Sequence, residues 1–222
     1  DVGAMSKMEL KEYRKKAQLI FQDPYAALNP RMTVRDIIAE PLEVMELVQT
    51  REEADQKVRE IASKCRLNLE HLRRFPHAFS GGQRQRISIA RTLVCSPNFV
   101  VADESVAALD VSIQADILNL LKSLQNNLGL TFLFISHDLS VVAHICDTVA
   151  VMYLGTIVES APTRSLFTQP KHPYTKALLS AIPTLNPEDR GKAQKLEGEI
   201  PSPVNPPSGC RFHTRCPVAE DR

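Results

Sequence analysis

Residues 77–94 read HAFSGGQRQRISIARTLV, and this stretch decides how the rest of the chain is interpreted. Apolar residues recur at helical spacing in ISIARTLV, so the serine, two glycines and glutamine before it lie at the start of a helix. The first N–H groups of a helix have no partner inside it, and the helix dipole favours negative charge at this end. We therefore expect an outward-facing diglycine turn that attracts an anion.

Composition excludes several classes of protein. The 222 residues are 43% hydrophobic and carry a formal charge of +1, which is typical of a globular protein and argues against a dedicated nucleic-acid binder. The sequence contains neither an apolar run of about 18 residues nor a secretory leader at its start, so a cytosolic location is expected. Cys65, Cys95 and Cys146 are interpreted as core residues, and an odd number of cysteines indicates reduced thiols or metal ligands.

Strand and helix patterns alternate along the chain. S-x-x-E at residues 6–9 and T-x-x-E at residues 50–53 predict helix starts, and residues 33–47 and 50–65 have helical periodicity. The segments AQLIF, FVVAD, LTFLFI, DTVAVMY and TIVES have strand character, and residues 111–128 form an amphipathic helix that ends at Gly129. Strands alternating with helices predict an α/β fold with a mainly parallel sheet, interrupted by a helical middle region.

Polar groups follow three of the predicted strands. Asp103 and Glu104 end FVVAD, His137 follows LTFLFI, and Gln22 follows AQLIF. Open parallel sheets bind ligands at the carboxyl ends of their strands, where one carboxylate can hold Mg²⁺ and the other can activate a water molecule. Taken alone, a strand that ends in two acids is more often just a solvated strand end.

In combination these motifs resemble ATP-binding-cassette ATPases. Gln22, FSGGQ, VVADE, the ALD at residues 108–110 and His137 occur in the order and approximate spacing of that family, and FSGGQ is similar to its signature LSGGQ. Three segments are similar in sequence to the ATPase subunits of bacterial and archaeal oligopeptide and dipeptide importers, namely IFQDPYAALNPRMTV, ALDVSIQA and GCRFHTRCP. The resemblance covers essentially the whole chain.

The resemblance implies a P-loop NTPase-like fold and a role for each motif residue. Glu104 is the expected general base and His137 the expected γ-phosphate contact, and Asp103 and Gln22 are expected at Mg²⁺. In the family two subunits pair head to tail, so Ser80, Gly81, Gly82 and Gln83 are expected to face ATP bound to the other subunit. Asp110 is expected to line that interface.

The resemblance also implies cofactors, partners and a location. The cofactors are ATP and Mg²⁺. The expected partners are a second ATPase subunit, identical or different, the membrane-spanning permease subunits and, indirectly, an extracytoplasmic peptide-binding protein, with no nucleic acid. The expected location is the cytoplasmic face of the cell membrane, as a peripheral protein.

The chain also departs from the family. No G-x-x-x-x-G-K-[ST] phosphate loop occurs in residues 1–222, which is expected if the chain is an N-terminally truncated fragment with little ATP binding, no turnover and exposed sheet edges. Ser105 stands where the family normally has proline, and Ala107 where a serine is common. The expected domains are a partial ATPase core at 1–23 and 96–160, a helical signature subdomain at 24–95, and a C-terminal extension at 161–222.

The C-terminal region is rich in proline, and residues 183–209 are interpreted as an extended linker. Beyond it, Cys210 and Cys216 could be two surface thiols. Their surroundings are also similar to a cysteine-rich element that carries an iron–sulfur cluster in some peptide importers, and a [4Fe–4S] cluster needs four thiolates. In the full-length protein these two cysteines are therefore possible cluster ligands, whereas this chain alone is not expected to hold one.

Two other functions remain open at this stage. One is a non-catalytic module that keeps the signature surface only to complete a partner's ATP site. The other is an ATP-binding-cassette protein that acts on DNA or ribosomes, although such proteins lack the importer-like residues 172–217.

Overall fold

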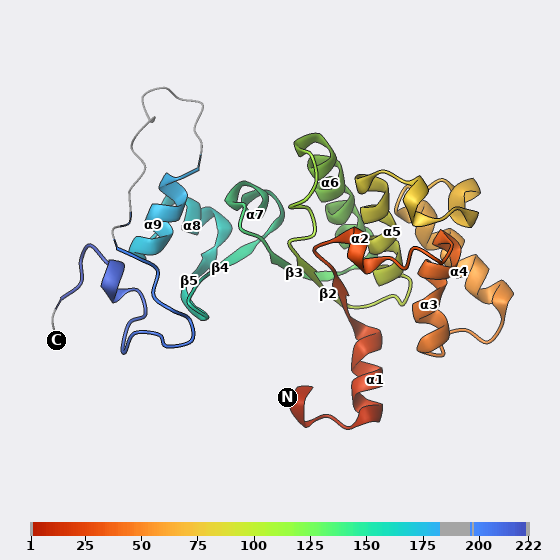
Figure 1. Cartoon of the computed structure of the whole chain (residues 1–222), viewed down its shortest axis with the longest axis horizontal. Coiled ribbons are helices and arrows are strands. Elements are labelled where there is room, and N and C mark those ends of the chain that lie inside the picture. The colour runs from red at the N-terminus through yellow and green to blue at the C-terminus, as the bar shows by residue number, and fades with distance from the viewer. Residues whose placement is uncertain (1, 183–195, 197, 221–222) are drawn as a thin grey trace. The chain divides into compact units, whose positions relative to one another are not determined.

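The structure is a computed structural model that describes residues 2–182, 196 and 198–220 (Figure 1). The chain divides into two compact units, residues 1–137 and residues 138–222. Part of the predicted linker at 183–209 lies outside the described residues. In the part of the chain that is described, no helix is long and apolar enough to span a bilayer.

A three-stranded parallel sheet forms the centre of the first unit. Its strands lie in the order β1 (Ala17–Ile20), β2 (Phe99–Asp103) and β3 (Thr131–Ile135). The Cα partners Ile20, Ala102 and Phe134 align across the sheet, as do Leu19, Val101 and Leu133. The predicted parallel sheet is confirmed for these strands, and their carboxyl ends lie at one edge.

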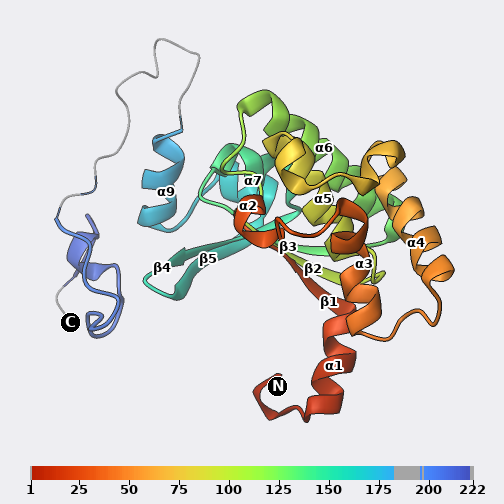
Figure 2. The same ribbon diagram turned by 45° about the vertical axis from the view of Figure 1, so that its right-hand side comes forward.

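The two faces of this sheet differ in burial. Ile20, Val100 and Ala102 are fully buried on the face covered by helices, where α5 (Gly81–Leu93) packs against β1 and against α6 (Val111–Leu128) (Figure 2). On the opposite face Leu19 is 38% exposed and Leu133 is 49% exposed. The first unit therefore carries an apolar sheet face that its described residues leave partly open to solvent.

The first long helix begins where the sequence predicts. A short 3₁₀ turn, η1 (Val2–Ala4), precedes α1 (Lys7–Lys16), which starts with a complete capping box between Ser6 and Glu9 and leads directly into β1. After β1 comes α2 (Pro24–Ala27), capped by Asp23. Helix α6 ends at Gly129, whose φ of 64° belongs to the left-handed conformation that glycine adopts without strain.

The middle region is helical, as predicted. It contains α3 (Val34–Val44), capped by Thr33, and α4 (Arg51–Lys64), capped by Thr50, followed by the 3₁₀ turns η2 (Leu69–Arg73) and η3 (Pro76–Ala78) and then α5. Helix α3 packs against both α4 and α5. Its buried residues recur at helical spacing, and Ile38 and Ala39 are fully buried.

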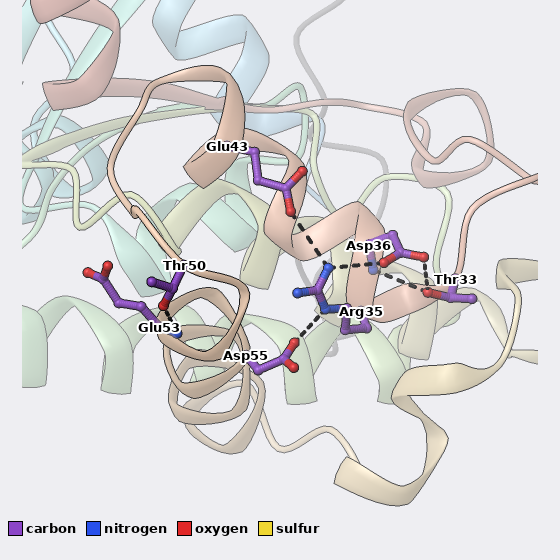
Figure 3. Close-up of polar contacts among 7 residues, drawn as sticks. All are labelled: Thr33, Arg35, Asp36, Glu43, Thr50, Glu53 and Asp55. Atoms are coloured by element: carbon purple, nitrogen blue, oxygen red, sulfur yellow. Dashed lines mark hydrogen bonds and ion pairs between the residues drawn. The ribbon is translucent and has the colours of Figure 1, made fainter.

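Arg35 links α3 to α4 (Figure 3). Its Nε donates to Asp55 at 2.6 Å, and its Nη1 lies 3.1 Å from Asp36 and 3.6 Å from Glu43. Burial alone lowers the pKa of Arg35, but the hydrogen bonds to Asp55 and Asp36 outweigh it and raise the pKa. The hydroxyl of Thr33, assisted by Arg35, holds the pKa of Asp36 below its usual value. The network joins the two helices by charge-assisted hydrogen bonds.

The second unit contains an antiparallel hairpin between short helices. Its elements are α7 (Leu139–Ile145), β4 (Thr148–Tyr153), β5 (Thr156–Pro162), α8 (Thr163–Thr168), α9 (Pro173–Ser180) and η5 (His213–Arg215). Strands β4 and β5 pair only with each other in the described sheets, whereas the strand patterns up to residue 160 predict membership of the partly parallel ATPase core. Only two residues, Leu154 and Gly155, separate the strands, and so short a turn can join only antiparallel neighbours.

Phe212 anchors the C-terminal segment to this hairpin unit. Its side chain is fully buried, with ring centroids 5.2 Å from Tyr153, 5.5 Å from Tyr174 and 5.3 Å from His172. The preceding Arg211 donates a hydrogen bond to the carbonyl of Leu154 in the hairpin turn. Cys210 and Cys216 therefore flank an aromatic anchor in the sequence.

Candidate functional site

Three of the predicted site residues converge at the carboxyl edge of the parallel sheet. The Nε2 of Gln22 donates to Oε2 of Glu104 at 2.5 Å, and Nδ1 of His137 lies 2.9 Å from Oε1 of the same carboxylate. These residues follow β1, β2 and β3. Because the three strands are parallel neighbours, their carboxyl ends bring the three side chains close together. An ionised carboxylate can only accept hydrogen bonds, so Nδ1 of His137 carries the proton in this arrangement.

The backbone of Glu104 is strained. Its φ of 43° lies in the left-handed region, which costs a residue with a side chain about 1–2 kcal/mol. Two hydrogen bonds hold it there, from its N–H to the carbonyl of Ile135 at 2.9 Å and from the N–H of Ala107 to its carbonyl at 3.0 Å. Such conformations persist where the surroundings enforce them and cluster at functional sites. The sequence held no signal for this conformation.

The turn after Glu104 contains a buried polar group. The Ser105 side chain is 2% exposed, and its hydroxyl has no hydrogen-bond partner among the described residues. Ser105 is the second residue of the turn that the Ala107 hydrogen bond closes, a position at which proline fits well. The departure from the family pattern therefore leaves an unsatisfied hydroxyl on the residue that follows Glu104.

The signature residues form the start of α5. Ser80 and Gln83 complete a capping box, in which the Ser80 hydroxyl accepts from the Gln83 N–H and the Gln83 side chain accepts from the Ser80 N–H. Ser80 and Gln83 are exposed and Gly81 is half-buried, but Gly82 is buried. The expectation that both glycines face outward is therefore wrong for Gly82.

Gly82 is buried because α6 packs against it. A Cβ added there would lie 2.5 Å from Cγ2 of Ile113, whereas one added at Gly81 would lie 3.6 Å from Leu109. Only glycine allows so close an approach between the two helices. The outward surface of the turn consists of Ser80, Gly81 and Gln83.

Asp103 and Asp110 lie at the edges of the same region. Asp103 is the exposed last residue of β2, aligned with Ile135 of β3. Asp110 precedes α6 and makes no side-chain capping bond to it. In the described part of the chain, no hydrogen bond or ion pair joins either side chain to Glu104, so their predicted roles stay predictions.

The comparisons with known proteins now identify the family. A family model described as ABC transporter matches residues 2–107, and one described as the C-terminal region of oligopeptide/dipeptide transporters matches residues 158–222. A putative peptide import ATP-binding protein of Brucella ovis is 53% identical over 221 residues, covering 100% of this chain and 69% of its own. The chain belongs to the ABC transporter ATPases, among the ATP-binding subunits of peptide importers.

Further relatives of this ABC ATPase agree. A putative oligopeptide transport ATP-binding protein of Bacillus subtilis is 56% identical over 99% of this chain and 67% of its own length. The dipeptide transport ATP-binding protein of Escherichia coli is 54% identical over 91% of this chain and 60% of its own length. The chain thus spans roughly two thirds of the length of the curated relatives it matches.

Solved ABC cassettes share the fold. The cbiO1 protein of Clostridium perfringens, part of an ABC transporter complex, superposes with a TM-score of 0.66 at 26% identity, covering 74% of this chain and 64% of that one. A dimeric ATP-binding cassette bound to ADP and Pi gives a TM-score of 0.62 at 27% identity, covering 72% of this chain and 69% of that one. The α/β fold with a parallel sheet is that of an ABC ATPase.

The residues present include oxygen donors suited to Mg²⁺ but too few thiols for an iron–sulfur cluster. The exposed carboxylate of Asp103 and the amide oxygen of Gln22, whose Nε2 faces Glu104, are oxygen donors of the kind Mg²⁺ prefers. Cys210 and Cys216 supply two thiols, and in the described part of the chain no cluster of three or more His, Cys, Asp or Glu residues could hold a metal. Two thiols do not make a [4Fe–4S] site, so the cluster hypothesis finds no support in residues 1–222.

Proposed function

We propose that the intact protein hydrolyses ATP to drive peptide import, with Glu104 as the general base. The main support is that the side chains of Gln22 and His137 both contact the carboxylate of Glu104. A general base must lie within hydrogen-bond reach of the attacking water, and each Glu104 oxygen still has lone pairs to accept from it. His137 holds the carboxylate in place from one side, and Gln22 does so from the other.

Mg²⁺ would be held by Asp103 and Gln22, where it would neutralise charge on the ATP phosphates. Ser80, Gly81 and Gln83 would face the nucleotide of a second ATPase subunit, and Gly82 would allow the close approach of α6. Asp110 would lie along that interface. The dimeric arrangement of a related cassette bound to ADP and Pi supports this pairing.

The named relatives support peptides as the transported substrate. We propose that the protein is peripheral to the cytoplasmic face of the membrane and binds permease subunits through its helical region, 24–95, together with the loop after Gln22. An extracytoplasmic peptide-binding protein acts with it indirectly. Residues 1–23 and 96–160 would belong to the ATPase core, and 161–222 to the proline-rich extension typical of peptide importers.

The decisive experiment replaces Glu104 in the complete protein. Loss of a positioned base lowers the rate by about 10²–10⁴, so Glu104→Gln is expected to keep ATP binding and lose nearly all turnover. Glu12→Gln, a change at an exposed glutamate in α1, is the matched control and keeps wild-type turnover. Wild-type turnover in Glu104→Gln would remove Glu104 from this role.

A second candidate function rests on one observation. Ser80 and Gln83 are exposed at the start of α5, so even without a phosphate loop these residues would offer the signature surface of a module that completes a partner's ATP site. Purified residues 1–222 are expected to show no Mg²⁺-dependent hydrolysis. Hydrolysis by that chain would contradict both this alternative and the importance of the loop.

A further inference from the structure

The loop that carries Gln22 has few buried residues of its own. In the segment from Phe21 to Leu28, only Pro24 and Leu28 are buried, and Tyr25 is 63% exposed. Asp23 caps α2 by accepting a hydrogen bond from the N–H of Tyr25, which belongs to the same loop. The position of Gln22 therefore depends on contacts that other elements make with this segment.

Arg84, in the first turn of α5, contacts one part of the loop. Its guanidinium carbon lies 3.8 Å from the centre of the Tyr25 ring. Its Nε donates to the carbonyl of Pro76 at 2.8 Å and its Nη2 to that of His77 at 3.4 Å. Arg84 is only 9% exposed, so these carbonyls fix a partly desolvated cation over the ring, where cation–π attraction is strongest.

Arg91 contacts the two ends of the loop. Its Nη1 donates to the carbonyl of Ala27 at 2.5 Å, and its guanidinium carbon lies 5.7 Å from the Phe21 ring centre. Residues seven apart on a helix share a face, so Arg84 and Arg91 project from α5 toward the same segment. Gln22 lies between their contacts in the sequence.

We propose that Arg84 and Arg91 are positioning residues that hold this loop so that the Gln22 amide reaches Glu104. Neither arginine touches the carboxylate, and both act through the loop. The effect of the two arginines on hydrolysis rests on the proposed function, whereas their effect on the contact between Gln22 and Glu104 does not.

The contact can be measured in residues 1–222 without any turnover. The probes are the NMR signals of the Gln22 side-chain amide and the hydrogen exchange of residues 21–28. Arg91→Met and Tyr25→Leu are expected to move the amide signals to those of a solvated amide and to speed exchange about tenfold, since each removes a charge-assisted contact. Arg91→Lys, which keeps a cationic donor for the Ala27 carbonyl, is expected to restore most of both readouts.

Arg86→Met is the matched control. Arg86 lies on the same helix and donates to the carbonyl of Cys65 at 3.3 Å, away from the Gln22 loop. Unchanged Gln22 signals in Arg91→Met and Tyr25→Leu, or equal changes in Arg86→Met, would overturn the proposal. If Arg91→Met does not fold, Tyr25→Leu still tests the proposal. Tyr25 is mostly solvent-exposed, so its replacement is not expected to prevent folding.

Turnover separates the two proposals. In the complete ATPase, Arg91→Met is expected to lower kcat about tenfold and to raise the KM for ATP by less than that, because Asp103 would still hold the Mg²⁺ of bound ATP whereas Glu104 loses the Gln22 amide. An unchanged kcat beside a lost Gln22 contact would refute the positioning role in hydrolysis. Wild-type turnover in Glu104→Gln with an intact Gln22 contact would instead refute the proposed base.

Discussion

Replacing Gly82 by alanine tests the close packing of α5 on α6. The new methyl carbon would lie 2.5 Å from Cγ2 of Ile113, and contacts shorter than 3.4 Å are already tight for a Cβ. Such overpacking costs about 1–3 kcal/mol, whereas alanine gains up to ~1 kcal/mol in helix propensity over glycine. We expect Gly82→Ala to lower the free energy of unfolding by about 1 kcal/mol.

Gly81→Ala is the matched comparison. Its Cβ would meet Leu109 at 3.6 Å, an ordinary contact, so this variant is expected to be unchanged or more stable by up to ~1 kcal/mol. Ile113→Leu moves the obstructing methyl away from the β-carbon at nearly constant volume. Combined with Gly82→Ala, it is expected to recover most of the lost stability.

Thermal unfolding followed by circular dichroism measures these differences. A change of 1 kcal/mol shifts the Tm by about 2–4 °C in a protein of this size. Equal Tm values for Gly81→Ala and Gly82→Ala would refute the argument that α6 requires glycine at one of the two positions. So would a failure of Ile113→Leu to restore the Tm of the Gly82 variant.

Other variants test the buried hydroxyl, the charge network and the thiols. Ser105→Ala should raise the free energy of unfolding by about 1 kcal/mol in urea titrations, because it removes an unsatisfied buried hydroxyl, and a lower value would show that Ser105 has a partner. Asp36→Asn should lower it by ~0.5 kcal/mol at pH 7, since the Asp36 side chain is 42% exposed. The pKa of Asp36 is lowered by folding, so its contribution persists above the unfolded pKa near 3.8 and is lost as the pH falls further. The free energies of unfolding of the wild-type protein and Asp36→Asn should therefore differ at pH 7 and become equal at about pH 2. The same difference at both pH values would contradict this. Iodoacetamide at pH 8 should label the exposed Cys210 in the native protein but Cys65 only after unfolding. Burial raises the pKa of Cys65 to about 12, which keeps its thiol protonated and unreactive. Labelling of Cys65 in the native protein, detected by mass spectrometry, would contradict its burial.

Local signals account for what the sequence predicted well. Ser6, Thr33 and Thr50 lie at helix starts because a hydroxyl followed by a polar or acidic residue satisfies free N–H groups, which depends only on neighbours in the chain. Glu104 and His137 meet because both end strands of one parallel sheet, so the order of motifs was enough to bring them together.

Features that depend on distant residues could not be predicted. The burial of Gly82 depends on Ile113 from another helix, and no pattern within FSGGQ indicates it. The role of Arg91 depends on the Ala27 carbonyl, 64 positions away. A strand pattern also does not specify its partner, so the patterns after Asp147 predict strands of the core sheet, whereas the two strands form a separate hairpin. Its two-residue turn at Gly155 was the available signal.

The open sheet face around Leu19 and Leu133 has a practical consequence for studies of residues 1–222. Self-association through apolar side chains produces particles of dimer size on a sizing column whether or not nucleotide is added. Sulfate strengthens such contacts because it is excluded from apolar surface. If the elution volume changes with sulfate and not with ATP, the dimer therefore forms by association of exposed apolar sheet faces. Such a dimer is not evidence for the head-to-tail pairing of ATPase subunits.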